Sequence, residues 1–391
     1  MNRMSPRATM SVACAGIFAL GLITAALGPA LPNLASLTGS TLSAMGGIFT
    51  ALFLGALLAQ VATGPINDRF GPRPVLMGGL LLLAAGTVGL TLSRSLAATL
   101  ALTVVAGLGH GAADVGFILL VPRLFLARSV SAMNLLAFFF GAGAVAGPAV
   151  ASVSLRLMDS ALPALWLGAA VVALGVPLVP ALSTGTTASQ PISAGPGAAP
   201  GSPLASPLLW ALGGLLLVYV GVENAIGGWT TTYLELTTGM AVASAALATS
   251  GFWGALTAGR MLGAALGERL APSRLLLTSL AGALAGGALL VFSGGNAVLS
   301  IGAILLLGLS FGPIYPTAVA ITSDQFTPNA GTATSAVVAL GSLGGMLIPA
   351  VQGVLIDRQG APAGAWLVLA CTAAMLLLKA GQKRPISPNV G

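Results

Sequence analysis

Three charged residues lie inside long apolar stretches of the chain, where a charge is costly unless it serves a purpose. Asp114, Glu223 and Arg260 are each flanked by runs of Ala, Gly, Leu and Val. A charged side chain at the centre of a bilayer costs about 3 kcal/mol on insertion scales, so such residues usually face a partner, a cavity or a transport path. We expect the functional groups of this protein to be found among them.

Asp114 is the best candidate for a group that gains and loses a proton. It lies in Gly107–Gly116, a stretch of small residues that lets helix backbones approach closely. A carboxylate in such a place can relay a proton, and the alternative is a structural hydrogen bond between helices. Arg260 and His110 are the candidates for an ion pair inside the membrane, and a packed or hydrogen-bonded role is the alternative for the histidine.

A second group of polar residues surrounds Glu223. Asn224 follows it directly, and Trp229 comes after Gly227 and Gly228, which predict a break in the helix. Carboxylate, amide and indole groups offer acceptors, donors and a stacking face, so they suit a polyhydroxylated ligand. We interpret Glu223, Asn224 and Trp229 as substrate-binding residues. The alternative is a Trp at the membrane interface and a Glu near the end of the helix.

The composition excludes most classes of protein. Of the 391 residues, 56% are hydrophobic and 6% are charged, whereas soluble domains carry about 25% charged residues. A soluble enzyme and a nucleic-acid-binding protein are therefore excluded, and we expect an integral membrane protein. The sequence shows no metal-ligand cluster, nucleophile constellation or Walker-type loop. We therefore predict no enzyme activity and no cofactor, with a proton gradient as the driving force.

Twelve apolar segments are long enough to cross a bilayer, and without water to satisfy the backbone they must be helices. They lie at 9–31, 42–63, 74–93, 96–121, 132–155, 162–182, 207–233, 242–266, 274–293, 297–320, 331–355 and 362–380. A Gly-, Pro- and Ser-rich segment without charge separates the first six from the last six. We predict an all-α membrane protein with a six-helix half at 1–183, a flexible cytoplasmic linker at 184–206 and a second half at 207–391.

The basic residues predict the orientation of these segments. With the N-terminus inside, 11 of the 15 Lys and Arg residues fall in cytoplasmic segments, three fall outside and Arg260 lies within a span. The expected location is the cell (inner) membrane, with both termini cytoplasmic. The expected partners are the lipid bilayer and a small-molecule substrate, without nucleic acid, and we expect a monomer.

The two halves repeat each other at an offset of 200 or 201 residues, and one repeated feature is a loop between the second and third spans. Glycines in this loop permit a tight turn, and its aspartate can cap a helix or pair with a cation. We expect the loop to gate the cytoplasmic side, and the alternative is an ordinary basic loop that fixes topology. The residues assigned to this gating motif are Gly64, Asp68, Arg69, Gly71 and Arg73, with Glu268 and Arg269 in the second copy.

The loop at 64–73 resembles the signature of the major facilitator superfamily: a glycine, then Asp-Arg, then a glycine and a basic residue. A parallel repeat of two six-helix halves is also the layout of that fold. Further stretches are similar to the fucose permease-like branch (fucose–galactose–hexose–proton symporters). These stretches are Gly111–Gly116, Tyr219–Trp229, Phe252–Arg260, Phe311–Thr317 and Gly344–Pro349.

This resemblance implies a secondary active transporter that moves a sugar or sugar-like solute by alternating access, coupled to protons through Asp114. It adds Trp253 and Tyr315 to the substrate-binding residues. The fucose permease also has an acidic residue in its first span, whereas the equivalent stretch here, 16–32, contains none. Glu223 is therefore the candidate for a second coupling group, and fucose itself is not favoured as the substrate.

Two other functions stay open. Gly143–Pro148 partly resembles the signature of drug–proton antiporters of the same superfamily. Those antiporters carry an arginine early in the fourth span, which would fall near Thr103 in this chain. A non-transporting membrane receptor is less consistent with the sequence, because the longest predicted loop has only about 24 residues.

Overall fold

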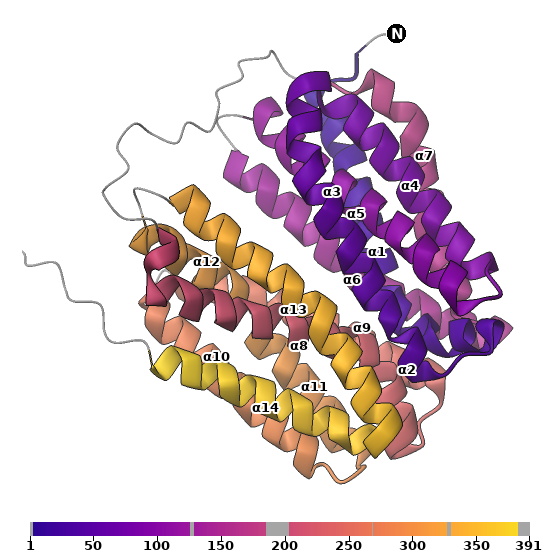
Figure 1. Ribbon diagram of the computed structural model, residues 1–391, viewed down its shortest axis with the longest axis vertical. Coiled ribbons are helices and arrows are strands. Elements are labelled where there is room, and N and C mark those ends of the chain that lie inside the picture. Colours follow the sequence, from indigo (N-terminus) through magenta and orange to yellow (C-terminus); the bar gives the residue numbers. More distant parts are fainter. Residues whose placement is uncertain (1–2, 126–128, 185–202, 268, 327–329, 382–391) are drawn as a thin grey trace, which may run out of the picture.

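The computed structural model describes residues 3–125, 129–184, 203–267, 269–326 and 330–381, and every regular element within these ranges is a helix (Figure 1). The helices that precede residue 183 are called the N-terminal bundle, and those that follow residue 202 are called the C-terminal bundle. The N-terminal bundle consists of α1 (Pro6–Thr38), α2 (Leu42–Met45), α3 (Gly47–Phe70), α4 (Pro72–Leu92), α5 (Leu96–Leu124), α6 (Ser129–Met158), α7 (Leu162–Gly175) and the 3-10 helix η2 (Val176–Ala181). The C-terminal bundle consists of η3 (Pro203–Ala205), α8 (Pro207–Thr238), α9 (Val242–Gly267), α10 (Pro272–Phe292), α11 (Ala297–Phe311), α12 (Ile314–Gln325), α13 (Ala330–Gln359) and α14 (Ala361–Ala380).

The predicted all-α membrane fold is confirmed. Within the described residues, 11 helical segments are long and apolar enough to cross a membrane. The predicted span at 242–266 also forms a helix, α9, but it is not among the 11. Its sequence mixes Ser, Thr, Gly and Arg260 with apolar residues. Most of the predicted linker lies outside the described residues.

The predicted helix break at Gly227 and Gly228 is wrong, because α8 runs without interruption from Pro207 to Thr238. The glycines instead let α1 cross α8 closely: a Cβ atom at Gly28 would lie 2.5 Å from the carbonyl oxygen of Gly228. The break falls in the tenth predicted span, where α11 ends before Gly312 and α12 begins after Pro313. At this junction Gly312 packs directly against the backbone of Arg260 in α9. A side chain at residue 312 would not fit there.

The repeat seen in the sequence is reproduced by the helices. The helices α4 and α10 are each 21 residues long and start at matching prolines, Pro72 and Pro272. The helices α1 and α8 both end on a glycine in the left-handed conformation, Gly39 and Gly239. Each position in one bundle can therefore be compared with its match in the other.

The two bundles are joined at one end of the molecule, where α1 and α8 finish and α2 lies; we call this the α2 end (Figure 1). The hydroxyl of Thr50 in α3 donates to the carbonyl of Met346 in α13 at 2.7 Å. The hydroxyl of Ser250 in α9 donates to the carbonyl of Val145 in α6, also at 2.7 Å. Both contacts lie in the half of the bundles nearer the α2 end. Trp229 of α8 is packed within the apolar core of the N-terminal bundle.

Candidate functional site

Glu223 and Arg260 form an ion pair inside the C-terminal bundle. Arg260 Nη2 donates to Glu223 Oε1 at 3.5 Å, and the side chains of Arg260 and Glu223 are 33% and 10% exposed respectively. The pair joins α8 to α9, at the level where the α11–α12 junction packs against α9. A guanidinium carries five N–H donors, and this contact engages one of them. Arg260 therefore pairs with Glu223 and still has N–H groups that can donate to a ligand.

Two tyrosines extend this pair towards α11 and α12. Tyr219 is buried one turn before Glu223, and its charged neighbours are Glu223 and Arg260. Within the described residues its hydroxyl makes no hydrogen bond of ordinary geometry. Its ring lies 5.6 Å from that of Phe311 and 6.3 Å from that of Tyr315. Sequence reasoning missed Tyr219, although a residue four positions before Glu223 on a helix lies on the same face.

Tyr315 has charged neighbours from both bundles. Asp114 of α5, Glu223 of α8 and Arg260 of α9 all lie within electrostatic range of its hydroxyl. Asp114 itself is half-buried and makes no ion pair or hydrogen bond with the rest of the described chain. With Asp114 and Glu223 each carrying −1 and Arg260 carrying +1, the cluster has a net charge of −1. We call these residues, together with Tyr219, the central polar cluster.

Among the described residues His110 forms no ion pair, so the structure does not support that expectation for the histidine. Its Nε2 atom lies 3.2 Å from the hydroxyl oxygen of Thr24 in α1. The Thr24 hydroxyl donates to the carbonyl of Leu20 at 2.9 Å, so the imidazole Nε2 acts as the donor to Thr24. His110 therefore links α5 to α1 through this hydrogen bond.

The structure also places the two predicted ligands that follow Glu223 on α8 in different surroundings. Trp229 is fully buried, and its Nε1 donates to the carbonyl of Pro349 at 2.9 Å. Its ring fills the space that a Cβ atom at Gly46 or Gly353 would need. It offers no free face to a ligand, so its predicted stacking role is not supported by its packing. The Asn224 amide nitrogen donates to the carbonyl of Val220 in its own helix at 2.8 Å, which leaves its oxygen as an acceptor.

Trp253 keeps the features of a binding residue. It is 6% exposed, packs over Gly227 and meets Phe252 edge-on at 5.3 Å between ring centroids. Its indole N–H is buried and has no hydrogen-bond partner in the part of the chain that the structure describes. Buried donors are nearly always paired, so an unpaired one calls for a reason, and a bound solute is one.

The gating motif is only partly described. Glu268 and the side chain of Asp68 lie outside the described residues, and Gly64 is described only as part of the α3 backbone. Gly71, with φ +80°, makes the turn between α3 and α4, and the Arg69 guanidinium lies over the ring of Phe70 at 5.1 Å. Arg73 donates from Nη2 to the carbonyl of Leu182 at 2.7 Å. Arg73 thus ties α4 to the residue that follows η2, at the end of the bundle opposite the α2 end.

The glycines of the antiporter-like stretch have a packing role. Gly143 and Gly147 of α6 lie directly against the backbone of α1 at Phe18 and Leu22. Gly344 of α13 makes the matching contact with Leu217 of α8. Close helix approach accounts for these glycines in both bundles. As for metals, no three His, Cys, Asp or Glu side chains among the described residues are grouped so as to hold an ion.

A repeated bundle of membrane helices with charged residues packed among them is characteristic of membrane transport proteins. The chain matches the model of the Major Facilitator Superfamily over residues 13–349, with a further match over 211–389. The chain therefore belongs to the Major Facilitator Superfamily.

Its relatives are named as transporters of different solutes. The chain is 26% identical over 395 residues to the sodium-dependent glucose transporter 1 of Danio rerio, covering 92% of this chain and 66% of that relative. It is 27% identical over 330 residues to the probable nitrate/nitrite transporter NarK2 of Mycobacterium tuberculosis, covering 79% of each.

Solved structures show the same fold. The nucleoside transporter NupG has a TM-score of 0.76 at 14% identity, covering 96% of this chain and 98% of that one. A D-xylose-proton symporter has a TM-score of 0.74 at 14% identity, covering 94% and 96%. The predicted major facilitator fold is therefore confirmed.

Proposed function

We propose that this protein is a secondary active transporter that moves a sugar or sugar-like solute across the cell membrane, coupled to protons. The observation that carries the proposal is the central polar cluster, in which Tyr315 lies within electrostatic range of both Asp114 and the Glu223–Arg260 pair. The cluster draws on both bundles, so a solute bound there contacts both. The names of the relatives, a glucose transporter and a D-xylose-proton symporter, support a sugar as the substrate class.

The charge of the cluster favours a neutral solute over an anion. Arg260, the one cation of the cluster, already faces Glu223 at 3.5 Å, so the cluster offers no unpaired cation to a nitrate-like substrate. The groups that it offers instead are tyrosine hydroxyls and spare guanidinium donors, which match the hydroxyls of a sugar. The cluster therefore favours a sugar over the nitrate named for the relative NarK2.

Asp114 is the proposed site of proton coupling. It is the acid of the cluster without a cationic partner, whereas Glu223 is held by Arg260. Protonation of Asp114 takes the net charge of the cluster from −1 to 0, and this difference distinguishes two stages of a transport cycle. Glu223 is the proposed ligand of the solute, with Trp253 and Tyr315.

The proposed mechanism is alternating access, and the way in which the bundles meet supports it. The contacts of Thr50 with Met346 and of Ser250 with Val145 hold the bundles together towards the α2 end. If the two bundles rock against each other about the central polar cluster, these contacts break and others form at the end of the molecule opposite the α2 end. With both termini in the cytoplasm, the structure corresponds to a state closed on the outer side. Neither a second subunit nor a cofactor is needed for this cycle.

The test is uptake by proteoliposomes that contain the purified full-length protein. Monosaccharides, nucleosides and cationic drugs are first compared by the melting temperature of the protein, which a bound ligand raises. Uptake of the best ligand is then measured with an imposed pH gradient, an imposed Na⁺ gradient or neither. We expect uphill uptake with the pH gradient. Accumulation driven by Na⁺ alone would refute proton coupling, and stabilisation only by drugs would favour the efflux alternative.

The variant Asp114→Asn separates coupling from binding. We expect it to bind the solute and exchange it across the membrane but to lose uphill accumulation, because no proton is carried. The control is Asp159→Asn, an exposed acid directly after α6 with φ +53°, a conformation that Asn also tolerates. Accumulation by Asp114→Asn at the wild-type rate would show that Asp114 is only structural.

A further inference from the structure

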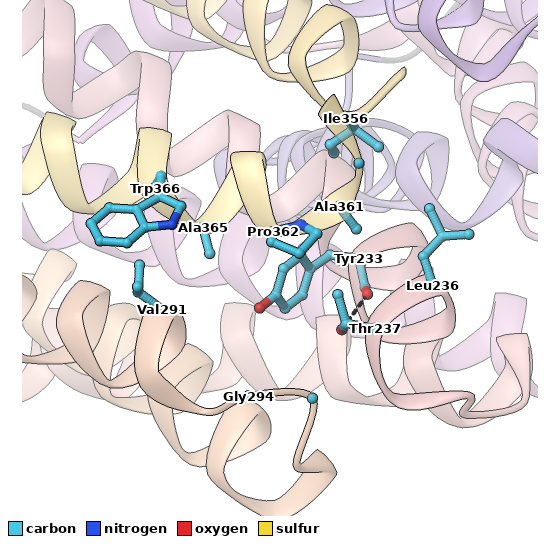
Figure 2. Close-up of a pocket in the computed structure, with 12 residues that line it drawn as sticks. Tyr233, Leu236, Thr237, Val291, Gly294, Ile356, Ala361, Pro362, Ala365 and Trp366 are labelled. Carbon is cyan, nitrogen blue, oxygen red and sulfur yellow. Dashed lines mark hydrogen bonds between the residues drawn. The ribbon is translucent and has the colours of Figure 1, made fainter. Parts of the chain in front are cut away.

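A pocket opens at the α2 end of the C-terminal bundle (Figure 2). Its volume is about 520 Å³, and it lies between the end of α8, the end of α10 with the following loop, and the junction of α13 and α14. None of its 12 lining residues is charged. Tyr233, Leu236, Val291, Ala365 and Trp366 are the lining residues on which its chemistry depends.

At the position in the N-terminal bundle that matches the pocket, two helices are joined by a hydrogen bond. Trp166 and Trp366 match at an offset of 200 residues, and Trp166 Nε1 donates to the hydroxyl of Thr91 at 3.0 Å. The residue that matches Thr91 is Val291, which has no acceptor in its side chain. The indole N–H of Trp366 therefore has no hydrogen-bond partner within the described chain. In Figure 2 the indole of Trp366 lies beside Val291 at one end of the pocket.

A second hydrogen bond at this place in the N-terminal bundle is also absent from the described part of the C-terminal bundle. Asn33 Oδ1 accepts a hydrogen bond from the backbone N–H of Ala161 at 2.9 Å, which ties the end of α1 to the start of α7. The match of Asn33 is Tyr233, whose hydroxyl donates instead to the carbonyl of Leu290 in α10 at 3.4 Å. The residues at the matching positions of the C-terminal bundle therefore do not form the hydrogen bond that Asn33 makes to the start of α7, and they leave the indole donor of Trp366 free.

The surroundings of the pocket are those of a membrane interface. Leu236 and Trp366 are each 56% exposed, and Phe292, next to Val291, is 75% exposed. Apolar side chains that are this exposed face lipid in a membrane protein. Tyr and Trp at the ends of membrane helices sit at the level of the lipid headgroups and esters. The pocket is therefore open to lipid molecules at that depth.

We propose that this pocket binds a membrane phospholipid through its ester region and the upper part of one acyl chain. The apolar walls take the chain, and Trp366 Nε1–H donates to an ester carbonyl, as Trp166 does to Thr91. The uncharged lining leaves the headgroup outside, so the site selects diacyl lipids by their glycerol esters rather than by headgroup charge. The proposal does not depend on which solute the protein transports.

The test is photolabelling of the full-length protein in liposomes with a phosphatidylcholine that carries a diazirine near the ester end of one acyl chain. Labelled peptides are identified by mass spectrometry. We expect labelling at 361–366 to exceed labelling at the matching region 161–166. Val291→Thr restores the acceptor found in the N-terminal bundle and should reduce labelling at 361–366 about fivefold, the factor that one hydrogen bond of ordinary strength provides.

Two further variants complete the design. Ala365→Phe fills the pocket and should abolish the excess labelling, whereas Leu377→Phe, an exposed position further along α14, should leave it unchanged. Val291→Thr preserves side-chain shape, so the test stands even where Ala365→Phe fails to fold. Equal labelling of both regions, or labelling unaffected by Val291→Thr, would overturn the proposal. Protection by excess sugar or by glycerophosphocholine would assign the pocket to a soluble ligand and would overturn it too.

Discussion

The Glu223–Arg260 pair allows a quantitative test of the central polar cluster. Two unit charges 3.5 Å apart attract each other by about 5 kcal/mol at an effective dielectric constant of 20. The Arg260 side chain is 33% exposed, so water screens part of this attraction. The hydration that the two charges lose on burial offsets a further part. We therefore expect a coupling energy of about 2 kcal/mol between the two side chains.

The measurement is a double-mutant cycle with Glu223→Gln, Arg260→Gln and the double variant. The free energy of unfolding is measured for each in mixed micelles. Because the second substitution removes a charge that the first has left unpaired, the double variant should be more stable than the sum of the two single effects predicts. It also returns the cluster to its original net charge of −1, whereas Arg260→Gln alone brings it to −2. The double variant should therefore bind solute better than Arg260→Gln alone.

The control is a pair of residues that do not touch. Asp159→Asn combined with Arg260→Gln should give additive effects, since Asp159 is an exposed residue of the other bundle. Additive effects in the Glu223–Arg260 cycle itself, within the error of the control, would refute the view that these charges stabilise each other. Arg260 would then be free to serve the substrate alone.

Three other substitutions test separate parts of the structure. Thr50→Val removes the hydrogen bond to Met346 and should shift the equilibrium about fivefold towards the state that is open at the α2 end. Distances between spin labels on the two bundles measure this shift. The control Thr38→Val breaks only local hydrogen bonds at the end of α1 and should leave the equilibrium unchanged. Trp229→Phe should lower the free energy of unfolding by about 1 kcal/mol without changing solute affinity, because its indole N–H is bonded to Pro349. Trp253→Phe should weaken solute affinity, because its buried indole N–H is unpaired within the described chain. Equal losses of affinity in the two variants would contradict the assignment of Trp253, and not Trp229, to the solute. Arg73→Ala should slow transport with solute binding retained, and loss of binding with normal turnover would disprove a gating role.

The spans and the location of the charged groups could be read from the sequence because a bilayer restricts the alternatives so strongly. Apolar segments without water must form helices, and charges inside them stand out against their surroundings. The expected helix at 96–121 was found as α5 and the one at 207–233 as α8, each within five residues at its ends. Asp114, Glu223 and Arg260 needed no structure to be singled out.

Which side chains meet was decided by tertiary packing. Glu223 and Arg260 are 37 residues apart on different helices, so no local pattern predicts their contact. Trp229 lies six residues from Glu223 on the same helix, yet its indole packs into the gap at Gly46 and Gly353 rather than against a ligand. The Gly227–Gly228 pair that suggested a break is a helix crossing. A glycine permits either outcome, and only the approach of a second helix determines which one occurs.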